Sequence, residues 1–190
     1  MTKVYFSFDI EADGEVPSLS NMLALGIWIL DEQGNDIDSW QRNIKETAPR
    51  KATSRCIKDF WDKQPEAWKA IHTDQVTPQQ AMSDLADLIK KYSEYQITWL
   101  ARPAAYDWQW VKGYYEEFAP SDSPAIGFSA LCLSSMWGLY QEMNHLGKND
   151  RKELWKKWAG DAKMSHQPVD DAHYQANIFK GLMKATHIWN

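Results

Sequence analysis

The chain has 190 residues, of which 44% are hydrophobic and 25% charged, a composition that excludes intrinsic disorder and fits one domain over residues 1–190. Its formal net charge of −5 argues against a protein that coats nucleic acid through general phosphate contacts. Two cysteines are too few for a disulfide framework. Because the sequence shows neither a signal-peptide pattern nor an apolar run long enough to span a membrane, we expect a cytoplasmic protein without a membrane partner.

Apolar or alternating segments predict three consecutive strands in an antiparallel meander, at residues 4–10, 22–30 and 37–44. Helices are expected next, over residues 53–62, 65–71 and 77–92, the last with Thr77 as N-cap and Pro78 in its first turn. The pattern then predicts a strand at 97–101, a helix at 106–118, a fifth strand at 126–133 and a closing helix at 169–183. This order indicates an α/β fold with a mixed sheet flanked by helices.

Two carboxylates, Asp9 and Glu11, stand at the end of the first predicted strand. Residues at i and i+2 share one face of a strand, so both side chains point the same way. Two like charges ~6 Å apart cost about 3 kcal/mol at an effective dielectric near 20. Bound Mg²⁺ or Mn²⁺ would cancel this repulsion, since both ions prefer oxygen ligands. A solvated acidic turn that continues through Asp13-Gly14-Glu15 is the alternative interpretation.

Three further candidates lie far along the chain. Asp107 follows the strand at 97–101 and opens a helix, where a lone aspartate commonly favours the helix dipole. His166 precedes an irregular segment containing Pro168, and Asp171 begins the last helix. Each of these features is weak by itself, and they gain meaning only in combination with Asp9 and Glu11.

Taken together, the segments FDIEADG (8–14), ARPAAYD (101–107) and His166-x4-Asp171-Ala172 resemble the three motifs of the DEDDh family of 3′→5′ exonucleases. This family belongs to the ribonuclease H-like superfamily and includes ribonuclease T-like and DnaQ-like members. The resemblance extends from residue 4 to about 183. Many members carry His-Asn where this chain has Arg102-Pro103. Asp170 would give the spacing of the related tyrosine subclass, but Ala172 favours Asp171 as the motif residue.

The resemblance implies a ribonuclease H-like, five-stranded mixed sheet and two divalent ions, Mg²⁺ or Mn²⁺. It implies four metal ligands, which are Asp9, Glu11, Asp107 and Asp171. It also implies that His166 is the general base. Asp9 would bridge the ions, and His166 would deprotonate the attacking water. The implied partner is the 3′ end of single-stranded RNA or DNA. A homodimer is possible, because several similar exonucleases form one.

Substrate contacts are expected from Arg102 and from three aromatic residues able to stack terminal bases, Tyr106, Trp61 and Trp108, with core packing as the alternative for each aromatic. Six basic residues lie between Arg42 and Lys58, and they either guide a phosphate strand or form an ordinary solvated face. Two other functions stay open at this point. One is a nucleic-acid-binding module that has lost catalysis, and the other is a ribonuclease H-like endonuclease.

Overall fold

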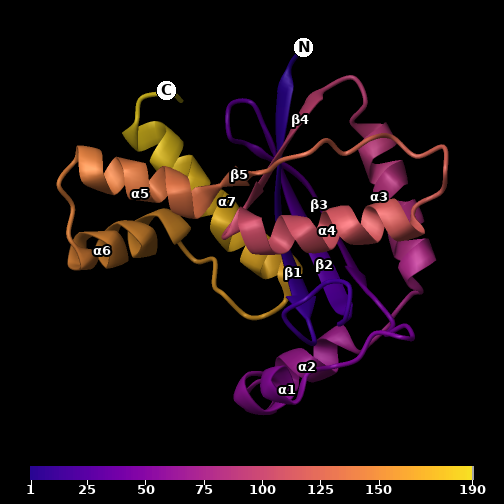
Figure 1. Ribbon diagram of the computed structural model, residues 1–190. Coiled ribbons are helices and arrows are strands. Elements are labelled where there is room, and N and C mark those ends of the chain that lie inside the picture. Colours follow the sequence, from indigo (N-terminus) through magenta and orange to yellow (C-terminus); the bar gives the residue numbers. More distant parts are fainter. Residues whose placement is uncertain (190) are drawn as a thin grey trace.

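The computed structural model describes residues 1–189, which contain a mixed sheet of five strands in the order β3-β2-β1-β4-β5 (Figure 1). The strands are β1 (Lys3–Ala12), β2 (Met22–Asp31), β3 (Asp36–Asn43), β4 (Gln96–Ala101) and β5 (Leu131–Cys132). β1, β2 and β3 pair antiparallel, whereas β4 runs parallel to β1 and β5 parallel to β4. The predicted meander and the predicted α/β class with a mixed five-stranded sheet are therefore confirmed.

Helices connect and cover these strands. They are α1 (Ser54–Asp59), the 3₁₀ helix η1 (Trp61–Lys63), α2 (Pro65–Ile71), α3 (Pro78–Lys91), α4 (Ala104–Phe118), α5 (Leu133–Met143), α6 (Lys148–Ala159) and α7 (Pro168–Ala185). The predicted N-cap of α3 forms, since the Thr77 side chain accepts a hydrogen bond from the backbone N–H of Gln80 at 3.2 Å. Proline occupies the first turn of α2, α3 and α7, where its missing N–H costs nothing.

The sheet separates two layers of helices. Alternate β1 residues such as Phe6 and Phe8 pack in one core with α3 and α4, while Tyr5 packs in a second core with α5, α6 and α7. α7 lies close against the sheet, and the Ser7 hydroxyl donates a hydrogen bond to the Ala172 carbonyl oxygen at 2.8 Å. Gly26 permits this approach, since a Cβ there would lie 2.2 Å from the Val169 backbone nitrogen. The first turn of α7 therefore lies over the polar face of β1.

Three sequence expectations differ from the structure. The predicted strand at 126–133 is wrong except for Leu131–Cys132, because Gly127 adopts φ +81° and Phe128 is 94% exposed rather than paired. The predicted helix at 53–62 ends at Asp59, and a separate 3₁₀ turn follows it. No element was expected between residues 134 and 164, yet α5 and α6 form there. Within residues 1–189, every helix is too short or too polar to cross a membrane.

Candidate active site

The polar face of β1 carries the first two candidate carboxylates. Asp9 is 9% exposed and Glu11 7%, so both are withdrawn from solvent. Both point toward α7: an Asp9 oxygen accepts a hydrogen bond from Gln175 Nε2 at 2.7 Å, and Glu11 contacts the loop that precedes α7. The acidic turn after them has a different role, because Asp13 is buried and accepts from the backbone and side chain of Asn21. Asp13 therefore closes the loop between β1 and β2.

Asp107 and Asp171 reach the same end of the sheet from two helices. β4 runs parallel to β1, so the chain leaves its carboxyl end at Ala101 and places Asp107 in the first turn of α4. Asp107 is 4% exposed, and among the described residues its Oδ2 has no hydrogen-bond partner. Asp171 is 1% exposed and accepts a hydrogen bond from the Ser165 N–H at 2.7 Å. Asp170 instead is exposed and is held by the Ser165 hydroxyl at 2.8 Å.

His166 completes the cluster from the loop before α7. Its backbone has φ +57°, the left-handed conformation that is uncommon for residues other than glycine. Its Nδ1 lies 3.6 Å from Glu11 Oε1, and its ring meets Phe60 edge-on with 4.8 Å between centroids. Ligand-capable atoms of Glu11, His166 and Asp171 all lie within 4.8 Å of one another. Two segments distant in the sequence, the end of β1 and residues 166–171, thus converge on one point.

Crowding and burial disfavour the charged forms of these carboxylates. Burial raises the pKa of Glu11 to about 7 and that of Asp107 to about 7. The pKa of Asp9 is raised well above its usual range, first by burial and then by the charges of Asp107, Glu11 and Asp171. Burial also raises the pKa of Asp171. Such a group of oxygen ligands is unfavourable while ionised and uncompensated, and it is suited to divalent cations.

Two nearby basic side chains interact favourably with these carboxylates. The guanidinium of Arg102 counteracts the rise in the pKa values of Asp9 and Asp107. The Glu11 carboxylate stabilises the imidazolium and so raises the pKa of His166. Arg102 follows the carboxyl end of β4, and this position explains how a residue 93 positions away in the sequence acts on Asp9.

The aromatic candidates for base stacking are placed differently from one another. Trp61 is 2% exposed and its indole N–H donates to the Ala12 carbonyl oxygen at 2.9 Å, so it supports the end of β1 and has no free face for a base. Trp108 is half-buried against Phe8 and Trp99, with centroids 5.9 and 5.4 Å away. Tyr106 is also half-buried, and its hydroxyl donates to the Gly14 carbonyl oxygen at 3.0 Å. Stacking on Trp61 is therefore excluded in this structure.

The three arginines of the basic stretch from Arg42 to Lys58 are each paired with a carboxylate. Arg42 pairs with Asp84 at 2.6 Å, Arg50 with Glu117 at 3.1 Å and Arg55 with Glu15 at 2.8 Å. These carboxylates lie 42, 67 and 40 residues from their partners in the sequence, so local sequence patterns could not predict the pairing. The interpretation as an ordinary surface therefore fits the three arginines better than a phosphate track.

Two residues of the site were missed by sequence reasoning. Gln175 is fully buried and donates to Asp9, and Phe60 contacts the ring of His166. Gln175 carries a usable signal, because it stands four residues after Asp171 and therefore on the same helix face. Phe60 carries none, since only the tertiary fold brings the end of α1 to the loop before α7.

Comparison with known proteins decides the family. Residues 4–183 match the family model described as the 3′-5′ exoribonuclease Rv2179c-like domain. The chain belongs to this family. It is therefore a 3′-5′ exonuclease, in agreement with the resemblance drawn from its motifs. A relative in Escherichia coli, the 3′-5′ DNA exonuclease Cap18, is 22% identical over 188 residues, covering 96% of this chain and 92% of the relative.

Solved structures of exonucleases share the fold of this family member. The 3′-exonuclease studied for 3′-end specific recognition of a histone mRNA stem-loop superposes with a TM-score of 0.70 at 14% identity, over 97% of this chain and 83% of that one. Magnesium- and manganese-bound Pop2p of S. pombe gives 0.61 at 15% identity, over 95% and 82%. E. coli exonuclease I with a dT13 oligonucleotide gives 0.72 at 12% identity, and 98% of this chain spans only 42% of that enzyme.

Proposed function

We propose that residues 1–190 form a single exonuclease domain that removes nucleotides from the 3′ end of single-stranded nucleic acid by a two-metal mechanism. The observation that carries this proposal is the convergence of four buried carboxylates with His166 at one end of the sheet. Family membership supplies the direction of cleavage. The geometry supplies the residues that would perform it.

The carboxylates fit a pair of divalent ions such as Mg²⁺ or Mn²⁺. Asp9, Glu11, Asp107 and Asp171 present hard oxygen ligands, and the buried Oδ2 of Asp107 has no partner among the described residues. Burial raises the pKa values of Glu11 and Asp107 to about 7, so their ionised forms are disfavoured unless a cation binds beside them. When bound, such ions neutralise these carboxylates and act as Lewis acids toward the phosphodiester.

In this proposal His166 would accept a proton from the attacking water. Its Nδ1 faces Glu11 at 3.6 Å, which orients the ring and leaves Nε2 for the proton transfer. Phe60 packs edge-on against the ring and limits its rotation. Gln175 holds Asp9 through its amide, and Ser165 holds Asp171 through its N–H. These two hydrogen bonds set the orientation of carboxylates on β1 and α7 before substrate binds.

The class of nucleic acid is the point on which the relatives differ. The matching family is described as exoribonuclease, whereas the E. coli relative is a DNA exonuclease. We propose single-stranded 3′ ends as the shared substrate, because unpaired ends of either nucleic acid reach a cluster at one end of the sheet without strand separation. Discrimination between RNA and DNA depends on contacts to the 2′-hydroxyl.

The decisive experiment is digestion of matched RNA and DNA oligonucleotides, labelled at the 5′ end, with Mg²⁺ or Mn²⁺. A ladder that shortens one nucleotide at a time from the 3′ end is expected from single strands. Asp171→Asn should abolish it, and the matched variant Asp170→Asn should retain it, because only Asp171 lies in the cluster. Internal fragments would indicate an endonuclease. Binding without cleavage would indicate an inactive module, and loss in Asp170→Asn alone would transfer the role to that residue.

A further inference from the structure

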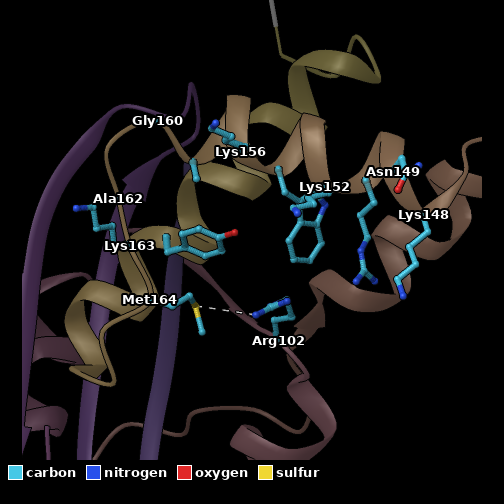
Figure 2. Close-up of a pocket in the computed structure, with 13 residues that line it drawn as sticks. Arg102, Lys148, Asn149, Lys152, Lys156, Gly160, Ala162, Lys163 and Met164 are labelled. Carbon is cyan, nitrogen blue, oxygen red and sulfur yellow. Dashed lines mark hydrogen bonds between the residues drawn. The ribbon is translucent and has the colours of Figure 1, made fainter. Parts of the chain in front are cut away.

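A hollow of about 810 Å³ lies beside the candidate active site, between α6, the loop after it and the residue that follows β4 (Figure 2). We call it the α6 hollow. Its lining includes six cationic side chains and, among the described residues, not one carboxylate: Arg102, Lys148, Arg151, Lys152, Lys156 and Lys163. The whole chain carries a net charge of −5, so this concentration of positive charge is local.

The sequence of α6 separates its charges onto two faces. Lys148, Lys152 and Lys156 recur every four residues and therefore lie along one side of the helix, which faces the hollow. The acidic residues of the same helix, Asp150 and Glu153, line a different surface together with Lys157. The helix thus turns its uniformly basic side to the hollow and its mixed side away.

The cations of the α6 hollow lack anionic partners among the described residues. Within residues 1–189 none of the six forms an ion pair, in contrast to the arginines at positions 42, 50 and 55. Two buried donors, Arg102 Nε and Trp155 Nε1, also lack hydrogen-bond partners in this part of the chain. The Trp155 ring lies beneath two guanidinium groups, 4.8 Å from Arg102 and 5.4 Å from Arg151. Unpaired donors and cations together match a ligand that carries several negative charges.

Two parts of the lining of the hollow adjoin the carboxylate cluster. Arg102 lines the hollow and also acts electrostatically on Asp9 and Asp107. Lys163 and Met164 line it from the loop that leads directly to His166. Arg102 bridges the two walls, with Nη2 4.0 Å from the Met164 sulfur (Figure 2). The hollow therefore shares Arg102 and the loop before His166 with the surroundings of the carboxylates.

We propose that the α6 hollow binds the phosphate backbone of the substrate strand on the 5′ side of the scissile bond. This inference rests on the proposed function. For an exonuclease only one nucleotide lies 3′ of the scissile bond, so every additional phosphate lies 5′ of it. The row from Lys148 to Lys156 rises about 12 Å along the helix, too long for one phosphate group. The strand is held by charge rather than by base identity, and affinity therefore depends on salt and on length.

The test compares two double variants that change the net charge equally. Lys152→Gln/Lys156→Gln removes two exposed charges from the hollow, and Lys157→Gln/Lys184→Gln removes two exposed charges elsewhere on α6 and α7. Dissociation constants for dT2, dT12 and a 12-base-pair blunt duplex are measured in EDTA at several salt concentrations. The same proteins are then assayed for cleavage of dT12 in Mn²⁺.

For the hollow variant we expect the slope of log K against log[salt] for dT12 to fall by about 1.4, since each phosphate contact on a single strand contributes about 0.7. This corresponds to roughly 25-fold weaker binding at 0.1 M relative to 1 M salt. Binding of dT2 should be unchanged in both variants, and binding of dT12 should be unchanged in the control.

Equal weakening in the control would overturn the inference, as would equal weakening of dT2, which would assign the hollow to the terminal nucleotide. Weakening of the duplex alone would assign it to a complementary strand and also overturn the inference. Wild-type cleavage of dT12 without any effect of the hollow variant on affinity would overturn the inference and keep the proposed function. The expected loss of affinity would support phosphate binding in the hollow even if the wild type cleaved neither dT12 nor the matching RNA U12, and that absence of cleavage would contradict the proposed function.

Discussion

Replacement of Asp107 by asparagine should stabilise the metal-free protein while abolishing catalysis. Burial raises the pKa of Asp107 from an ordinary 3.8 to about 7, which means that the fold disfavours its ionised form. At 1.36 kcal/mol for each pH unit of difference, ionisation costs the metal-free fold roughly 4 kcal/mol at pH 8. The uncharged amide avoids this cost. Desolvation of its buried polar atoms, however, cancels about 2 kcal/mol of the stabilisation.

The net gain of about 2 kcal/mol should raise the melting temperature by roughly 4–8 °C, because 1 kcal/mol shifts a chain of this size by ~2–4 °C. The sign depends on pH. Since the folded pKa lies above the unfolded value, the wild type carries no penalty below about pH 4, a growing penalty up to about pH 7 and a constant one above it. At pH 4.5 the wild-type penalty is only about 1 kcal/mol, less than the cost of the buried amide, so Asp107→Asn should melt slightly below the wild type at pH 4.5 and above it at pH 8.

The assay is thermal unfolding in EDTA at pH 4.5, 6 and 8, followed by circular dichroism. Asp122→Asn serves as the matched control, because Asp122 is exposed in the turn after α4 and its replacement should leave the melting temperature nearly unchanged at every pH. A melting temperature of Asp107→Asn at or below the wild-type value at pH 8 would refute the reasoning. A gain that is independent of pH would refute it equally, since it would arise from packing rather than from charge.

Three further predictions follow from the same site. Mn²⁺ at a hundredfold excess over its Kd should stabilise the wild type by about 2.7 kcal/mol relative to EDTA, and superimposable melting curves would contradict a metal site. His166→Ala should lose roughly 10²–10⁴-fold in turnover, while calorimetry finds Mn²⁺ affinity nearly unchanged; a parallel loss of Mn²⁺ affinity would make His166 a ligand instead. Gly26→Ala should lower the melting temperature and impair turnover, because its Cβ would lie 2.2 Å from the Val169 nitrogen and displace the turn that carries Asp171; an unchanged melting temperature would disprove the close approach.

Short-range patterns predicted the elements that carry the site. The alternation of β1 correctly placed Asp9 and Glu11 on one face, because the side-chain period of a strand depends only on local geometry. The N-cap at Thr77 and the meander followed from local signals in the same way. The motif spacing favoured Asp171 over Asp170 as the motif residue. In the structure Asp171, and not Asp170, lies in the cluster with Glu11 and His166.

Features that depend on partners distant in the chain could not be predicted. From the sequence, Arg50 was a candidate for phosphate binding. The fold pairs it with Glu117, which is 67 residues away in the sequence. Trp61 had the chemistry of a stacking platform, yet its indole is buried against Ala12. Local sequence reports which charges and rings a chain possesses. It cannot report which of them are already paired or covered, because pairing and burial are properties of the assembled surface.

The sequence by itself determined the first four strands of the sheet, the order of the three motifs and the chemistry that they imply. Only the tertiary structure decided which cations stay unpaired, and it selected α6, a segment without any predicted element, over the basic stretch around Arg50. It also revealed Gln175 as the partner of Asp9. The physical reason is that backbone periodicity is set within a few residues, whereas the electrostatic environment of a side chain sums over every group that the fold brings within a few ångströms.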